Sequence, residues 1–162
     1  MDTDALIKLT KASAKEAVCD GFTVVLAPAV RRESVDQGKA GGFPDAMRIE
    51  QNLEKGLLTV SRSRRSVKSE RILRELSLSG GEADTLRLYR AGGADLVVSD
   101  DGRFLSILEG LGVPFATPGA LLAALVKARK LSAREGMAFL DALVGMVSEA
   151  EYLETRRVLE EE

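Results

Sequence analysis

The chain has 162 residues, a formal net charge of −2, a single cysteine and no histidine. This length fits one domain, and 45% hydrophobic with 30% charged residues is typical of a soluble globular protein. The absence of histidine excludes Ser-His-Asp and Cys-His nucleophile systems and histidine-ligated zinc, copper or iron. A bound metal would rely on oxygen ligands, which favour a hard ion such as Mg²⁺ or Mn²⁺.

Two further features concern the compartment. Cys19 can form no internal disulfide, which fits a reducing cytoplasm, and its Ala-rich helical surroundings favour a small core side chain over a reactive thiol. The N-terminus begins with acidic residues, where a signal peptide needs a basic region. The longest weakly polar stretch, 112–126, contains two prolines and indicates strand, turn and helix. We therefore expect a cytoplasmic protein without a membrane span.

Helical and strand patterns alternate along most of the chain. Apolar residues recur near a 3.6-residue period in the helical segments, and short apolar, often β-branched runs indicate buried strands. The strands are expected at 23–27, 57–61, 94–99 and 113–116. The helices are expected at 4–18, from Pro28 through Glu33, at 45–55, 66–76, 79–93 and 101–111, after Thr117, after Ser132 and from about Ser148. The glycine-rich stretch 38–44 is expected to be a loop. This order favours an α/β domain with a mainly parallel sheet.

Two acids follow the strand expected at 94–99. Ligands of parallel sheets bind outside the carboxyl ends of the strands, so Asp100 would point toward a site. Asp101 is either a second acid of that site or the N-cap of the next helix. The alternative is that both are ordinary turn residues.

Other acids stand at unusual places. Glu82 opens a helix on its inward face, although Ser79 and Glu82 also have the spacing of a capping box. Glu33 lies on an apolar helix face, where a carboxylate needs a salt bridge or a metal. Asp2 joins the same edge of the sheet if Met1 and Asp2 end a short strand. Convergence of these carboxylates would suit one or two Mg²⁺ or Mn²⁺ ions that activate water for phosphodiester hydrolysis.

The segment 61–74 is a local positive patch on an acidic chain. Its basic residues could contact a nucleic-acid backbone, and a solvated helix and loop is the alternative. The residues that we expect to bind nucleic acid are Arg62, Arg64, Arg65 and Lys68.

Four segments together resemble the PIN domain family of metal-dependent ribonucleases, which includes the toxins of VapBC-type toxin–antitoxin pairs. They are DTDALI (2–7), PAVRRE (28–33), GEADTL (81–86) and GADLVVSDDGRF (93–104). The pattern covers residues 1 to about 130, so 131–162 is expected to be a C-terminal helical extension of the same domain. In the family a hydrophobic strand precedes the first acid, so here that strand is either very short or begins upstream of Met1.

The resemblance implies a three-layer α/β/α fold, an RNA substrate, Mg²⁺ or Mn²⁺ as cofactor and frequent homodimers. It implies catalytic roles for Asp2, Glu33, Glu82 and Asp100, and metal ligation by Asp2, Glu82, Asp100 and Asp101. The third acid is Glu82, where the family usually has Asp. The leading hypothesis is an endoribonuclease, as a candidate toxin with an antitoxin partner.

Two alternatives remain. A non-catalytic member of the family would keep the fold and act as a binding module. A phosphatase of the haloacid dehalogenase type would use the DxD spacing of Asp2 and Asp4, but the buried strand that should precede its nucleophile is missing.

Overall fold

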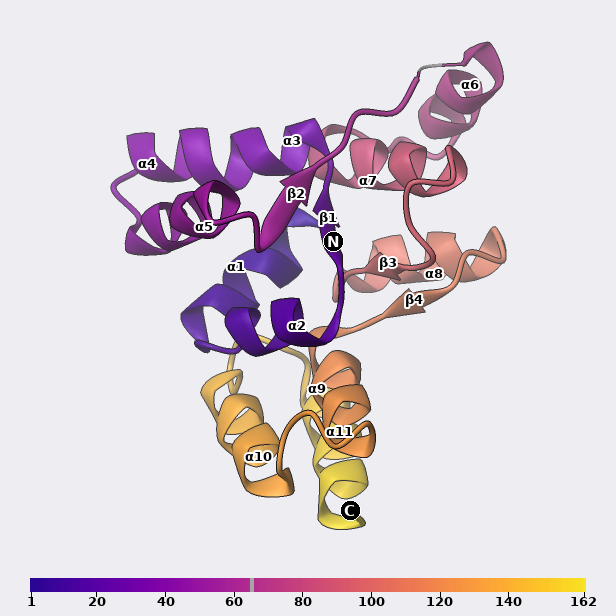
Figure 1. Ribbon diagram of the computed structural model, residues 1–162. Coiled ribbons are helices and arrows are strands. Elements are labelled where there is room, and N and C mark those ends of the chain that lie inside the picture. Colours follow the sequence, from indigo (N-terminus) through magenta and orange to yellow (C-terminus); the bar gives the residue numbers. More distant parts are fainter. Residues whose placement is uncertain (65) are drawn as a thin grey trace.

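The computed structural model describes residues 1–64 and 66–162, in which helices and short strands alternate (Figure 1). The strands are β1 (Val24–Leu26), β2 (Leu58–Val60), β3 (Val97–Val98) and β4 (Phe115–Ala116). The helices are α1 (Thr3–Lys11), α2 (Lys15–Gly21), α3 (Pro28–Arg31), η1 (Arg32–Gln37, a π-helix), α4 (Gly38–Ala40), α5 (Pro44–Glu54), α6 (Val67–Glu75), α7 (Gly80–Arg90), α8 (Gly102–Gly110), α9 (Pro118–Lys127), α10 (Ala133–Ala142) and α11 (Glu149–Glu160). The predicted α/β class is confirmed.

The strands form two parallel pairs, β1 with β2 and β3 with β4. The first two residues connect the pairs, because the Met1 amino group donates to Val25 O at 3.2 Å and Asp2 N donates to Val98 O at 2.9 Å. In Figure 1 the N-terminus accordingly lies at the centre of the fold, next to β1. The backbone at Met1 and Asp2 thus takes the place of a very short central strand. The parallel arrangement is as predicted, but the sheet is smaller, since only Val97 and Val98 of the segment 94–99 lie in strand β3.

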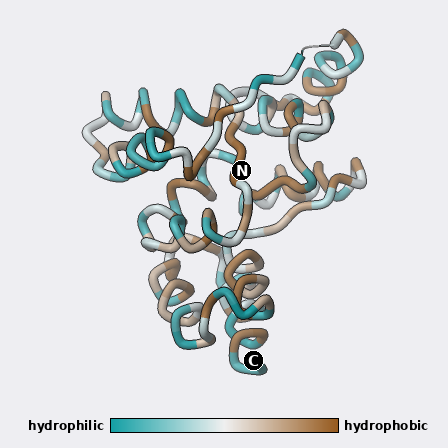
Figure 2. The backbone as a smooth tube through the Cα atoms, viewed as in Figure 1, coloured by the Kyte–Doolittle hydropathy of each residue, from teal (hydrophilic) through white to brown (hydrophobic). Residues whose placement is uncertain are grey.

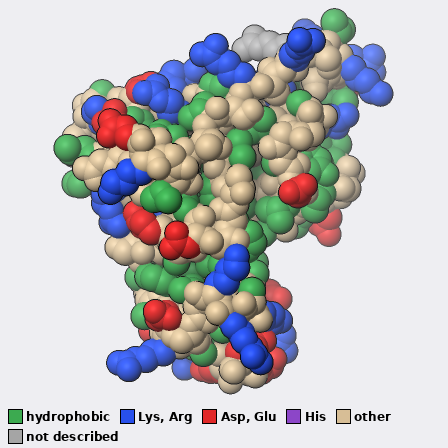
Figure 3. Space-filling view, viewed as in Figure 1, with side chains coloured by type: hydrophobic (Ala, Val, Ile, Leu, Met, Phe, Trp, Pro, Cys, Tyr) green, Lys and Arg blue, Asp and Glu red, His purple; other side chains and the backbone are tan. Residues whose placement is uncertain are grey.

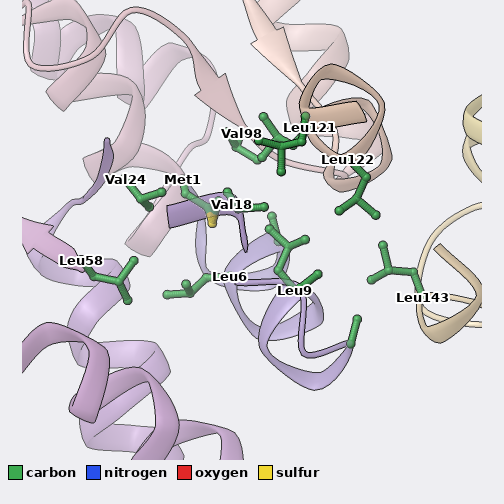
Figure 4. Close-up of a cluster of buried hydrophobic side chains, with 14 of the residues drawn as sticks. Met1, Leu6, Leu9, Val18, Val24, Leu58, Val98, Leu121, Leu122 and Leu143 are labelled. Atoms are coloured by element: carbon green, nitrogen blue, oxygen red, sulfur yellow. The ribbon is translucent and has the colours of Figure 1, made fainter. Parts of the chain in front are cut away.

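One hydrophobic core joins the sheet to the C-terminal helices. Leu6 and Leu9 of α1 belong to the same buried cluster as Val98, Leu122 of α9 and Leu143 after α10 (Figure 4). Figure 2 shows hydrophobic segments gathered around the N-terminus and the strands. Full burial of one such side chain contributes about 1.5–3 kcal/mol to folding. Helices α9, α10 and α11 pack on one another at the lower end of Figure 1 and share this core, so their burial supports the sheet that carries the acids.

Two expected boundaries differ in the structure. The helix expected at 4–18 is broken, because Ser13 has a positive φ of 58° between α1 and α2. The predicted loop at 38–44 is wrong for Gly38–Ala40, which continue the helical path as α4. A Cβ atom on Gly38 would lie 2.8 Å from the Cβ of Ala46, so this glycine serves close packing against α5.

The structure bears on two further expectations, one about membrane spans and one about Cys19. No helix of residues 1–64 and 66–162 is long and apolar enough to cross a membrane. Burial raises the pKa of the Cys19 thiol to about 11, so the thiol is protonated at neutral pH, as suits a small packing residue.

Candidate active site

Acidic side chains surround a hollow of about 380 Å³ at the carboxyl end of β3. Three helices begin at this place: α1 after Asp2, α7 after Ser79 and α8 after Asp101. Helix N-termini carry free N–H groups and the positive end of the helix dipole, so they favour nearby carboxylates. The hollow is lined by Asp2, Thr3, Asp4, Glu33, Ser79, Gly80, Gly81, Glu82 and Asp101.

Glu33 is held in place by two other segments. Its Oε2 accepts a hydrogen bond from Thr3 Oγ1 at 2.6 Å, and its Oε1 accepts one from Gly81 N at 2.9 Å. A Cβ atom on Gly81 would lie 2.6 Å from Glu33 Oε2, so the glycine permits this close approach. Glu33 thereby caps α7 from η1, whereas the side chain of Ser79 makes no capping hydrogen bond. The predicted capping box of Ser79 and Glu82 is therefore not formed.

Asp2 and Asp100 are the most buried acids of the site. The side chain of Asp100 is 4% exposed and the whole of Asp2 is also 4% exposed. Asp2 Oδ1 caps α1 by accepting from Ala5 N at 2.9 Å, and burial raises the pKa of Asp2 to about 6. Hydrogen bonds from Ser99 and Ala5 oppose that rise, while the charge of Asp100 adds to it. The charge of Asp100 therefore disfavours the charged form of Asp2.

Within the part of the chain that the structure describes, only one of the two Asp100 carboxylate oxygens has a hydrogen-bond partner. Lys8 Nζ donates to Asp100 Oδ2 at 2.5 Å, whereas Oδ1 is buried and has no hydrogen-bond partner among the described residues. A buried carboxylate oxygen without a partner is costly, because it has given up its water without replacement. Asp100 does not line the hollow and lies beside it.

Glu82 and Asp101 form the more open side of the site. Asp101 Oδ1 caps α8 through Phe104 N at 2.7 Å, so the predicted N-cap is present. The pKa of Glu82 is raised by partial burial first, and then by the charges of Asp101 and Glu33. Arg103 opposes this, with its Nη1 atom 3.7 Å from Glu82 Oε2. Glu82 therefore lies within electrostatic range of two other carboxylates.

The structure brings the predicted acids together at one place. Asp2, Glu33, Glu82 and Asp101 line the hollow, and Asp100 adjoins Asp2. Among the described residues, no three carboxylates stand in an arrangement that would hold one metal ion. Their chemistry does fit a hard divalent cation, because all donors are oxygen atoms and Asp100 Oδ1 has no partner in residues 1–64 and 66–162.

Sequence reasoning overlooked two charged residues of this neighbourhood. Lys8 pairs with Asp100 and, at 3.5 Å, with Asp4. Its i, i+4 spacing from Asp4 on one helix was the available signal. Half-buried Glu151 of α11 accepts from Gly119 N at 2.8 Å, and its pKa is raised by burial and by the charge of Asp100. No local pattern relates Glu151 to residues so distant in the chain.

The predicted basic patch is exposed where the structure describes it. Arg62, Arg64 and Lys68 are exposed, while Arg65 lies outside the described residues. Lys and Arg side chains gather along the upper edge of the molecule, over α6 and the segment before it (Figure 3). Arg62 also lines a second hollow of about 280 Å³ together with Arg32. Arg87 and Asp84 line this second hollow as well, so its lining carries charges of both signs.

Comparison with known proteins gives the family. A model of the PIN domain family matches residues 1–160. No curated protein and no solved structure shows significant similarity to the chain. The chain therefore belongs to the PIN domain family, whose members are generally nucleases. The family assignment favours the nuclease hypothesis over the phosphatase alternative.

Proposed function

We propose that this protein is a metal-dependent endoribonuclease that hydrolyses RNA phosphodiester bonds. The observation that carries the proposal is Asp100 Oδ1, a buried carboxylate oxygen without a partner among the described residues, beside a hollow lined by five further acids. Such an oxygen gains most from a hard cation. Membership of the PIN domain family supports the same chemistry.

Each acid receives a role from its contacts. Asp2, Glu82, Asp100 and Asp101 would hold Mg²⁺ or Mn²⁺, which supplies an activated water and stabilises charge on the phosphoryl group. Glu33 positions the site, because both of its oxygens are engaged by Thr3 and by Gly81 at the start of α7. Arg103 lies at the open rim, close enough to Glu82 to meet a phosphate there.

The test is cleavage of a labelled single-stranded RNA by the metal-free full-length protein with Mn²⁺ added or withheld. We expect cleavage with Mn²⁺ and none with EDTA. Glu82→Gln should lower the rate by roughly a hundredfold or more, because it removes charge where the cation would bind. The matched control is Glu109→Gln, an exposed acid of α8 outside the hollow, which should keep the full rate. Equal rates in both variants, or no cleavage at all, would contradict the proposal, and the latter would favour the binding-module alternative.

The basic patch gives a separate prediction about RNA affinity. Neutralising Arg62, Arg64 and Lys68 to Gln should weaken RNA binding and reduce its salt dependence. Each phosphate contact on a single strand contributes about 0.7 to the slope of log affinity against log salt, so the slope should fall by roughly 2. Fluorescence anisotropy at several salt concentrations measures this slope. An unchanged slope would show that RNA binds elsewhere.

The toxin role, the antitoxin partner and the homodimer stay predictions. They would place the ribonuclease under the control of a second protein, as the sequence resemblance implies. The cytoplasmic location is a proposal of the same kind.

A further inference from the structure

We propose that the Lys8 ammonium group is a built-in counter-ion of the carboxylate cluster, which competes with a divalent cation for Asp100 and thereby sets the metal affinity of the site. The inference rests on the proposed function and concerns the regulation of that same site. Lys8 would act on the cation through Asp100, which makes it a positioning residue.

The geometry places Lys8 where a cation is needed. Its Nζ lies 2.5 Å from Asp100 Oδ2, and the Asp100 side chain is 4% exposed. The charge of Asp100 acts on Asp2, and the charges of Asp100 and Lys8 both act on Glu151 of α11. The Lys8 ammonium group thus contacts Asp100 and Asp4 directly and acts on Glu151 at longer range. Without a positive charge this arrangement would be strongly unfavourable.

Lys8 satisfies only part of Asp100. A single ammonium group covers Oδ2 and leaves the buried Oδ1 without a partner among the described residues. A divalent ion could engage the carboxylate more completely than an ammonium group does. The Lys8 Nζ atom lies 2.5 Å from Asp100 Oδ2 and 3.5 Å from Asp4 Oδ2, and two carboxylates at these distances favour the charged form of the lysine.

Lys8 has a second carboxylate partner, Asp4, on its own helix. Asp4 Oδ2 lies 3.5 Å from Nζ on the solvent side, and the Asp4 side chain is 70% exposed. The lysine side chain has a flexible four-carbon stem. Its ammonium group can therefore move outward from Asp100 toward Asp4 without a movement of helix α1. We therefore expect two states of the cation site, the one in this structure with Lys8 on Asp100 and a second with Asp100 available to an ion.

The experiment measures Mn²⁺ binding to the metal-free full-length protein by isothermal titration calorimetry. Lys8→Met, which keeps the length but removes the charge, should bind Mn²⁺ about tenfold more tightly. Lys8→Arg should keep an affinity close to that of the parent protein. The matched control is Lys11→Met, an exposed lysine of the same helix, which should leave the affinity unchanged.

Thermal unfolding provides a second readout. In EDTA, Lys8→Met should melt at a lower temperature than the parent protein, because Asp100 loses its counter-ion. Mn²⁺ should raise the melting temperature of Lys8→Met more than that of the parent, since only bound cation then compensates Asp100. A variant destabilised merely by lost packing would show the first effect without the second.

The outcomes separate the two proposals. Equal Mn²⁺ affinity in Lys8→Met and the parent would overturn the role of Lys8 while leaving the nuclease proposal intact. If neither protein binds Mn²⁺, both proposals fail. If only Lys8→Met binds Mn²⁺, the competition is supported. Lys8 then prevents Mn²⁺ from binding to the parent protein.

Discussion

Replacing Asp100 with Asn should reduce Mn²⁺-dependent RNA cleavage by at least about a hundredfold. Asn keeps the size of the side chain but supplies no charge for a cation. The buried Oδ1, which has no partner among the described residues, is the atom most in need of such a cation. Cleavage of labelled RNA under single-turnover conditions measures the loss, and Mn²⁺ binding should weaken in parallel.

The control for this substitution is Asp95→Asn. Asp95 is an exposed acid in the segment before β3, and it lines a hollow with Met1 and Val24 instead of the acidic one. It carries the same change of charge on the same segment of chain, and its rate should equal that of the parent protein. Full cleavage by Asp100→Asn would show that the site does not need Asp100, and the proposed chemistry would then lose its main support.

Local sequence patterns predicted the elements that carry the acids better than the contacts between them. The apolar run before Asp100 marks a strand end, and Thr117 before a proline marks the start of α9, because both signals lie within a few residues. The break at Ser13 was missed, since a polar residue with positive φ has no strong local signature.

The contacts within the site depend on segments far apart in the chain. Ser79 and Glu82 have capping-box spacing, yet Glu33 supplies the cap of α7 from 48 residues away. Lys8 reaches Asp100 across 92 residues. Periodicity places each of these side chains on a helix face, but it does not say which other segment meets that face, because tertiary packing decides it.

Replacing Gly81 with Ala should lower the free energy of unfolding by about 1–3 kcal/mol. The new Cβ would lie 2.6 Å from Glu33 Oε2 and 2.7 Å from Thr3 Oγ1. Those two atoms form a hydrogen bond with each other at 2.6 Å, and Glu33 also accepts a hydrogen bond from Gly81 N. Neither the Glu33 carboxylate nor the Thr3 hydroxyl can therefore move away without losing a hydrogen bond. For a domain of this size the melting temperature should fall by roughly 3–10 °C, measured by calorimetry.

Gly110→Ala is the matched control, because Gly110 is also a helical glycine and a Cβ there would have nothing within 4 Å. This change should be neutral or stabilising by up to about 1 kcal/mol, since alanine favours helix more than glycine does. The double variant Gly81→Ala with Glu33→Ala separates crowding from helix propensity. With the Glu33 carboxylate gone, the added methyl group meets less resistance, so the double variant should be about as stable as Glu33→Ala alone. Strict additivity of the two changes would mean that Gly81 is not required for the approach of Glu33 to α7.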